Sequence, residues 1–243
     1  FPALSAMHPK ALFARAGHYF TEAAIPGTSV PSPATRGADV HIGEGCRFGP
    51  GVVLGDRVRV GDFVEIGAGT VLGSDTCIGN RTCIGPLCSV GHAPFDFVED
   101  GGRWLHTPVR AGVLVGDDCF IGARCTIPAG CARMTEIGSG VILDDGVHIG
   151  HDARVGSHTA IAGGVLVGGY VTLGPGCKIA GGAAIAEGVS LAAGVVVTAM
   201  TGVSSPVTRP GARVASGWPA MPAVKWWRLV SRVSRSVDDA TNQ

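Results

Sequence analysis

Aliphatic side chains return at every sixth position over most of this chain. From Ile42 to Val90, nine successive sixth positions hold an aliphatic or phenylalanine residue, usually followed by glycine. The period resumes at Val115 and, after a four-residue excess around 131–136, runs without interruption from Ile137 to Val203. In the first series, a small or β-branched residue stands two positions before each next aliphatic residue. Two inward positions per hexad predict a short strand followed by a turn, with glycine tolerating the tight corner.

Composition and charge support a repetitive fold with a narrow core. The chain has 39 glycines, 16% charged residues and 6% aromatic residues, which suits neither a disordered chain nor an ordinary sandwich. Basic and acidic residues both number 19, so no overall field attracts nucleic acid or a membrane. No apolar run reaches the roughly 18 residues of a membrane helix, and the N-terminus lacks a secretory pattern. We therefore expect a cytoplasmic protein with no integral membrane segment and no nucleic-acid partner.

The eight cysteines are expected to pack as small buried side chains. None of them forms a CxxC pair, and six take the small inward position of a hexad. This placement argues against disulfides and against a structural metal site, so we predict no metal. A zinc hydratase of the γ-carbonic-anhydrase type also uses hexads, but its HxxxxH spacing is absent.

The period divides the chain into three segments. Residues 1–39 form an N-terminal lead-in or cap, in which a short helix near 10–24 is one option. Residues 40–207 form the repeat, interrupted by an inserted loop at 92–113. Residues 208–243 form a proline-rich exit followed by a helix at 223–237, where apolar residues recur at helical spacing.

Two features of these segments suggest binding surfaces. The inserted loop carries Phe95, Phe97 and Trp104, and loops that leave a solenoid commonly bind ligands, so it is a candidate gate over a ligand groove. The alternative is an excursion with no function. The C-terminal helix places four cations on one face, which suits an acidic partner such as a carrier protein, although a solvated charged face is equally compatible. These residues are Lys225, Arg228, Arg232 and Arg235.

The hexad spacing resembles that of the hexapeptide-repeat superfamily. Chains of that superfamily wind as a left-handed parallel β-helix with three hexads in each coil. The resemblance implies an all-β fold in which 24 hexads make about eight coils, with an inserted loop and a C-terminal α-helix. Residues one coil apart are then vertical neighbours, separated by about 4.8 Å.

His151 is the strongest candidate for a catalytic residue. Imidazole titrates near neutrality, so His151 can take a proton from an attacking amine or hydroxyl group. Gly169 lies one coil later, where its N–H is a plausible donor to an oxyanion. Asp144 and Asp152 are both placed to orient the imidazole, and the sequence does not separate them.

Longer motifs resemble the LpxD family of UDP-3-O-(3-hydroxyacyl)glucosamine N-acyltransferases. They are Phe95-Asp-Phe, Asp100-Gly-Gly-Arg-Trp104, Leu143-Asp144, Ile149-Gly-His151, Thr159-Ala-Ile-Ala-Gly-Gly-Val165, Gly181-Gly-Ala183, Thr208-Arg-Pro-Gly211 and Ser216-Gly-Trp-Pro-Ala-Met-Pro222. The resemblance implies that His151 is the base and Gly169 the oxyanion donor. It also implies an acyl carrier protein as the acyl donor, C-terminal carrier docking, and a homotrimer with active sites between neighbouring chains.

Three departures limit the acceptor and the acyl chain. Residues 1–39 are too short for the family's N-terminal uridine-binding domain. Gly188 stands where the family has a second histidine, and Gly202 stands at the methionine that helps to set chain length, with Met200 close by. We assign His158, Met200 and Gly202, with the three loop aromatics, to substrate binding.

The expected function is an acyltransferase without a bound cofactor. It would move an acyl group from an acyl carrier protein or acyl-CoA thioester to a small amine, such as an amino sugar. Two alternatives remain, a non-catalytic trimeric ligand-binding scaffold and an acetyl-CoA-dependent sugar acetyltransferase.

Overall fold

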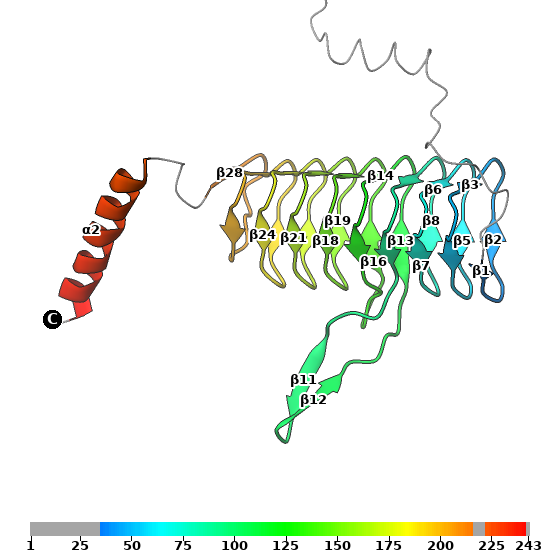
Figure 1. Ribbon diagram of the computed structural model, residues 1–243, viewed down its shortest axis with the longest axis horizontal. Helices are drawn as coiled ribbons and strands as arrows, with labels where there is room; N and C mark the ends of the chain where they lie inside the picture. The colour runs from blue at the N-terminus through cyan, green and yellow to red at the C-terminus, as the bar shows by residue number, and fades with distance from the viewer. Residues whose placement is uncertain (1–34, 216–221, 242–243) are drawn as a thin grey trace, which may run out of the picture.

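The structure is a parallel β-helix with a projecting hairpin and a C-terminal helix (Figure 1). This computed structural model describes residues 35–215 and 222–241, with side chains in the second range described through residue 232. The predicted helix near 10–24, most of the motif at 216–222 and the side chain of Arg235 lie outside the described residues. The architecture is consistent with the predicted left-handed β-helix, and the C-terminal helix is confirmed.

Three parallel sheets form the faces of the β-helix, and the chain visits them in turn. The first face holds β1 (Thr35–Arg36), β4 (Val53–Leu54), β7 (Val71–Leu72), β10 (Ser89–Val90), β15 (Thr126–Ile127), β18 (His148–Ile149), β21 (Leu166–Val167), β24 (Ala184–Ile185) and β27 (Gly202–Val203). The second face holds β2 (His41–Ile42), β5 (Arg59–Val60), β8 (Cys77–Ile78), β13 (Val113–Val115), β16 (Thr135–Ile137), β19 (Arg154–Val155), β22 (Thr172–Leu173) and β25 (Ser190–Leu191).

The third face completes each coil. It holds β3 (Arg47–Phe48), β6 (Glu65–Ile66), β9 (Cys83–Ile84), β14 (Phe120–Ile121), β17 (Ile142–Leu143), β20 (Ala160–Ile161), β23 (Lys178–Ile179), β26 (Val196–Val197) and β28 (Arg213–Val214). Two faces carry nine strands and the second carries eight, slightly more than the eight coils predicted. The excess arises because β1 and β28 pair onto the ends of the repeat, beyond the expected bounds 40–207.

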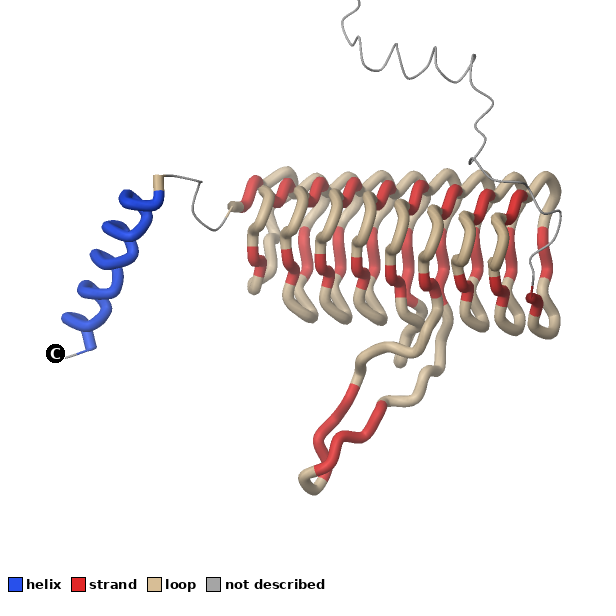
Figure 2. The backbone as a smooth tube through the Cα atoms, viewed as in Figure 1, coloured by secondary structure: helices blue, strands red, loops and turns tan. Residues whose placement is uncertain are grey.

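The register follows the predicted spacing of three hexads per coil. Leu166 pairs with Ala184, for example, and Arg154 with Thr172. The inserted loop lengthens the step between coils, so that Ser89 pairs with Thr126. The smooth tube of Figure 2 shows short strands alternating with corners along the whole helix. Vertical pairing satisfies the backbone polar groups of these strands, which are too short to be stable alone.

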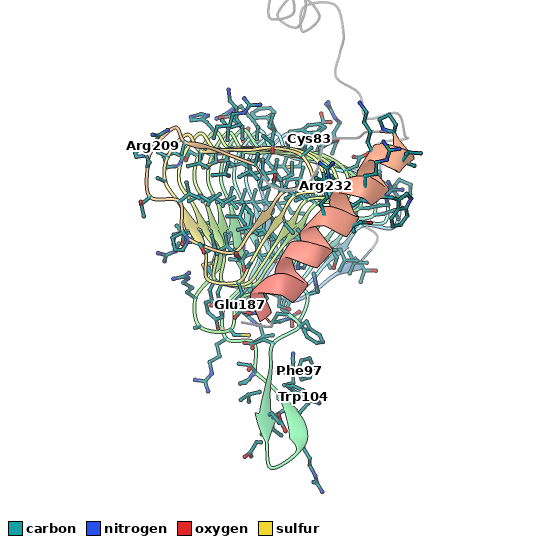
Figure 3. The ribbon with its side chains drawn as sticks, turned by 90° about the vertical axis from the view of Figure 1, so that its left-hand side faces the viewer. Cys83, Phe97, Trp104, Glu187, Arg209 and Arg232 are labelled. Carbon is teal, nitrogen blue, oxygen red and sulfur yellow. The ribbon has the colours of Figure 1, made fainter. Side chains whose placement is uncertain are left out.

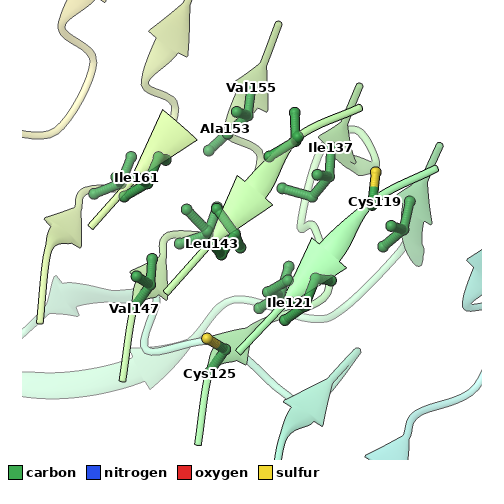
Figure 4. Packing of buried hydrophobic residues seen from close by; sticks show 14 of the residues in the cluster. Cys119, Ile121, Cys125, Ile137, Leu143, Val147, Ala153, Val155 and Ile161 are labelled. Atoms are coloured by element: carbon green, nitrogen blue, oxygen red, sulfur yellow. The ribbon is translucent and has the colours of Figure 1, made fainter. Parts of the chain in front are cut away.

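The core is a single column of inward side chains. The aliphatic residue of each strand and the small residue two positions earlier both point inward, and Figure 4 shows Leu143 and Ile121 packed beside Val147 and Cys125. The thiol of Cys125 donates to the carbonyl of Asp144. The buried cysteines therefore fill the small positions as predicted, with their weak donors satisfied.

The inserted loop forms a hairpin that leaves the β-helix at one corner. Its strands are β11 (Phe97–Asp100) and β12 (Arg103–His106), which pair antiparallel. In Figures 1 and 2 the hairpin projects well away from the coils. At its base, the amide of Thr107 donates to the carbonyl of Asp96.

The C-terminal helix α2 (Ala223–Thr241) begins where the sequence predicts and continues past the expected end at 237. Val224 and Trp227 on this helix are exposed, as are Lys225, Arg228 and Arg232. Over the described ranges 35–215 and 222–241, no helix combines the length and the apolar character needed to cross a bilayer.

Strand β7 provides a matched test of this packing. Leu72 is fully buried, whereas Val71 beside it points outward and is 42% exposed. Leu72→Ala should lower the free energy of unfolding by about 2–5 kcal/mol, because it leaves a cavity in a narrow core. Val71→Ala should cost less than about 1 kcal/mol by the same chemical denaturation measurement. Equal losses in both variants would contradict the inward and outward assignment.

Candidate active site

His151 and Asp152 lie together at the corner between the first and second faces. The corner follows β18 and precedes β19. Nδ1 of His151 lies 2.9 Å from Oδ2 of Asp152. The histidine is only 8% exposed and Asp152 is fully buried. A buried carboxylate on Nδ1 fixes the tautomer of the ring and leaves Nε2 without its proton in the neutral form.

The carboxylate of Asp152 is held by a cradle of backbone amides. The amide of Cys131 donates to Oδ2, and the amides of Ala132 and Arg133 donate to Oδ1, at 2.7–2.8 Å. These three residues belong to the four-residue excess that interrupts the hexads, so the irregularity forms an anion-binding nest. Gly130 permits the turn, because a Cβ there would clash with the carbonyl oxygen of Arg133.

These contacts determine the ionisation of the aspartate. Burial alone would raise the pKa of Asp152, but the amides and the His151 imidazole outweigh it and hold the pKa below its ordinary value of 3.8. Asp152 is therefore an anion near neutral pH, able to stabilise an imidazolium on His151.

Gly169 and Tyr170 lie at the same corner, one coil after His151 and Asp152. A Cβ on Gly169 would lie 2.8 Å from Nε2 of His151, so only glycine leaves that nitrogen open. The ring of Tyr170 meets the imidazole edge-on, with centroids 5.0 Å apart. Tyr170 has a φ of 58°, in the left-handed region where many corners of this helix use glycine. A bulky side chain there costs of order 1 kcal/mol, and Phe63, Leu87 and His158 adopt the same conformation at other corners.

The amide of Gly169 lacks the side-chain cap that some corner amides of this helix receive. At several corners, a side chain of the next coil caps the equivalent amide, as Asp62 caps Glu44 and Asp145 caps Ala123. The equivalent residue below Gly169 is Glu187, and among the described residues the Gly169 amide has no acceptor. This N–H is available to a ligand beside Nε2.

The structure separates the two candidate orienting acids. Asp144 closes a different corner, where its carboxylate accepts from the amides of Asp145 and Gly163. Of these two aspartates, Asp152 is the one that reaches the imidazole.

Two further histidines lie near His151. His148 precedes it on the first face and shares a hydrogen bond of 2.7 Å with the hydroxyl of Thr126. Burial lowers the pKa of His148, and the neighbouring His92 and His151 lower it further. Burial also lowers the pKa of His92. Both rings are consequently neutral at physiological pH, and the sequence alone assigns no role to either.

A groove of about 510 Å³ runs along the first face, from His148 to Gly202. His148, Leu166, Ala184 and Gly202 line it as the outward residues of successive coils, with Glu187 at its edge. Gly202 thus lies at the far end of the groove, where the absence of a side chain keeps it open. Met200 lies at the preceding corner and is 75% exposed.

Among the described residues, the other predicted substrate residues make no ring contact with His151. Phe95, Phe97 and Trp104 belong to the projecting hairpin, two of them labelled in Figure 3, and all three are exposed. His158 lies at the corner between the second and third faces, against Gly140. Within one chain the structure does not gather these residues around the imidazole.

The sequence analysis missed several residues of the site. Tyr170 could have been found, because it lies one coil after Asp152. Asp96, Cys131 and Arg133 fall in irregular segments, where the register gives no vertical neighbour. Asp96 comes from the hairpin base, and its carboxyl group acts on the thiol of Cys131. With His151, these two side chains make a group whose potential ligand atoms lie within 4.8 Å of one another.

The chain is a β-helix of stacked hexads with a histidine–carboxylate pair at one corner, and its sequence is similar to that of UDP-3-O-acylglucosamine N-acyltransferases. Over 150 residues, the chain is 39% identical to the UDP-3-O-acylglucosamine N-acyltransferase of Pseudomonas syringae pv. tomato, a match covering 62% of this chain and 42% of that relative. The predicted resemblance to hexapeptide-repeat acyltransferases is confirmed, and the chain spans less than half of the curated relative. No family model matches the chain.

Solved structures of two acyltransferases are similar to this β-helix. The UDP-N-acetylglucosamine acyltransferase from Campylobacter jejuni has a TM-score of 0.63 over 72% of this chain and 68% of that chain, at 21% identity, which is a likeness of fold. Another UDP-N-acetylglucosamine acyltransferase has a TM-score of 0.54 at 28% identity, covering 76% of this chain and 68% of that one.

The amide cradle predicts how stability depends on pH. At neutral pH, Asp152→Asn should lower the free energy of unfolding by roughly 2–4 kcal/mol, because three amides lose an anionic acceptor. Since folding depresses the pKa of Asp152, its stabilisation is complete above about pH 4 and is lost as the pH falls through the lower folded pKa. Chemical denaturation at stepped pH should show the gap between wild type and variant narrowing in that acid range. A constant gap would contradict the assignment, and Asp145→Asn, which affects one capped amide, should cost less.

Proposed function

We propose that this chain transfers an acyl group from an acyl carrier protein or acyl-CoA thioester to the amine of an amino sugar or another small amine. The observation that carries the proposal is the His151 imidazole, held through Nδ1 by a buried carboxylate and open at Nε2 beside an uncapped amide. A base and an oxyanion donor at one point are the two requirements of acyl transfer. No bound cofactor is needed for this chemistry.

In the proposed reaction, Nε2 of His151 takes a proton as the amine attacks the thioester carbonyl. The new C–N bond leaves an oxyanion, to which the amide of Gly169 donates. The anionic Asp152 stabilises the imidazolium through Nδ1–H. When the tetrahedral intermediate collapses, the C–S bond breaks and the imidazolium returns the proton to the departing thiolate.

The groove on the first face suits the acyl chain. It starts beside His148, passes the apolar side chains of Leu166 and Ala184, and ends at Gly202. Three steps between coils span about 14 Å at the usual strand spacing, enough for a medium-length chain. In this proposal Gly202 and the nearby Met200 influence chain length at the far end.

The amino-sugar acceptor rests on the names of the relatives, UDP-3-O-acylglucosamine N-acyltransferase and UDP-N-acetylglucosamine acyltransferase. Gly188 lies one coil after Tyr170, where the resemblance predicts a histidine, so in this proposal the acceptor side of the corner has no second imidazole.

We place the active enzyme in a cytoplasmic homotrimer. Phe120 and Ile142 point outward from the third face and are more than half exposed, and they line an apolar groove of about 410 Å³. Such a surface suits association with a second copy of the chain. In this arrangement Phe95, Phe97, Trp104 and His158 would reach the active site of a neighbouring chain and contact its substrate.

The primary test is acyl transfer by His151→Ala. With a panel of acyl thioesters and amines, and thiol release as the readout, this variant should lose activity by a factor of about 10²–10⁴. His41→Ala, which removes an exposed histidine from the second face, is the matched control and should keep wild-type activity. Circular dichroism and thermal denaturation check that both variants fold.

The same panel separates the competing functions. Full activity in His151→Ala would refute the mechanism. No thiol release from any donor with wild-type protein would favour the non-catalytic scaffold. A preference for the shortest donor would favour the acetyl-CoA-dependent sugar acetyltransferase over the longer-chain enzyme.

The exposed cations of α2 are proposed to dock the carrier protein. Lys225, Arg228 and Arg232 are solvent-exposed, and Arg235 follows on the same predicted face. Charge reversal at Arg228 and Arg232 should raise KM about tenfold for an acyl carrier donor but leave KM for the same acyl-CoA unchanged, because only the carrier offers an acidic surface. Arg59→Glu, on the second face, is the control. Equal effects on both donors would remove the docking role.

A further inference from the structure

Asp96, Cys131 and His151 make a cluster of three different ligand types. Each offers one potential ligand atom, and these atoms lie within 4.8 Å of one another. His151 and Cys131 are buried, and Asp96 is half-buried. The cluster joins three segments far apart in the sequence, namely the hairpin base, the four-residue excess and the His151 corner.

The donor set fits a first-row transition cation, and Zn²⁺ in particular. Zinc binds imidazole nitrogen, thiolate sulfur and carboxylate oxygen, often with three protein ligands and one open position. Ligand atoms around tetrahedral zinc lie about 3.5 Å apart, so binding would require the three groups to close by roughly 1 Å. Asp96 directly precedes β11, at the base of the projecting hairpin, and such a shift would fall in this inserted segment.

The surroundings of the cluster also match a metal site. Nδ1 of His151 is bonded to Asp152, so a metal would have to bind through Nε2. Metal-binding histidines characteristically donate their other N–H to a carboxylate, and Asp152 supplies one that is itself held by three amides. The guanidinium of Arg133 donates through Nε to the backbone carbonyl of Asp152 rather than to its carboxylate.

The negative charge of the cluster suits a cation. The carboxylates of Asp96 and Asp152 both act on the thiol of Cys131. The same carboxylates that disfavour a free thiolate attract a divalent cation, which replaces the thiol proton as the Zn–S bond forms.

We propose that Asp96, Cys131 and His151 bind Zn²⁺, with Asp152 as the carboxylate that orients the imidazole. One zinc binds to each chain, and binding releases the proton of Cys131. If His151 is the base of the proposed acyl transfer, zinc occupies the nitrogen that accepts the proton and inhibits the enzyme. The binding site itself does not depend on that function.

The test uses the full chain, stripped of metal with a chelator and titrated with Co²⁺ as a spectroscopic probe. Wild type should bind one equivalent with a thiolate-to-cobalt charge-transfer band, and Zn²⁺ should displace the cobalt. Cys131→Ser should abolish the band, and Asp96→Asn should weaken metal binding at least about tenfold. Cys83→Ser, which changes an outward cysteine at the opposite edge of the helix in Figure 3, should retain both the band and the affinity.

These outcomes separate the metal site from the acyltransfer function. Absence of the cobalt band in wild type, or an unchanged band in Cys131→Ser, would overturn the proposal. Asp96→Asn keeps every core side chain, so a folding failure of Cys131→Ser leaves a second decisive variant. Because metal binding is measured without substrate, a missing acyl transfer activity has no effect on the result.

Discussion

The site depends on the burial of one charge, the carboxylate of Asp152. An unpaired carboxylate in this core would be prohibitively unstable, so the chain supplies three amides and an imidazole to bind it. The amides come from a break in the hexad period, and the imidazole comes from the neighbouring corner residue. The irregular turn at 130–134, the orientation of His151 and the ionisation of Asp152 are thus a single arrangement. Removing any part leaves the others with unsatisfied polar groups.

The regular part of the molecule could be predicted from the sequence, since each hexad follows the same packing rule. The inward position of Leu72, the outward position of Val71 and the vertical relation of His151 to Gly169 all follow from counting residues. The register alone predicts that Gly169 lies next to His151. Coordinates are needed to show how close Gly169 comes to Nε2. The start of the helix at Ala223 was likewise evident from the spacing of apolar residues.

The rest of the site could not be predicted, because its residues lie where the hexad period is interrupted. The sequence left Asp144 and Asp152 as equal candidates, and the choice depends on an irregular turn whose shape no period describes. Asp96 and Cys131 meet through an insertion and an irregular coil, so no fixed offset relates them. Cys131 also occupies a small inward position, and its packing role concealed its position beside the imidazole. Phe95 and Phe97 were expected at the site, but in a single chain their rings contact each other and His106 rather than His151.

Every coil of the β-helix rises by the same distance along the helix axis. Each coil adds about one strand spacing to the groove on the first face without disturbing the corner at His151. Ala184 and Gly202 therefore lie on successive coils, each at a fixed distance along the helix axis from the coil of His151. In such a scaffold, replacing a small outward residue by a large one shortens the groove by whole coils. The residues at the His151 corner are not changed by that substitution. For the proposed acyl transfer, length selection and catalysis could accordingly diverge independently during evolution.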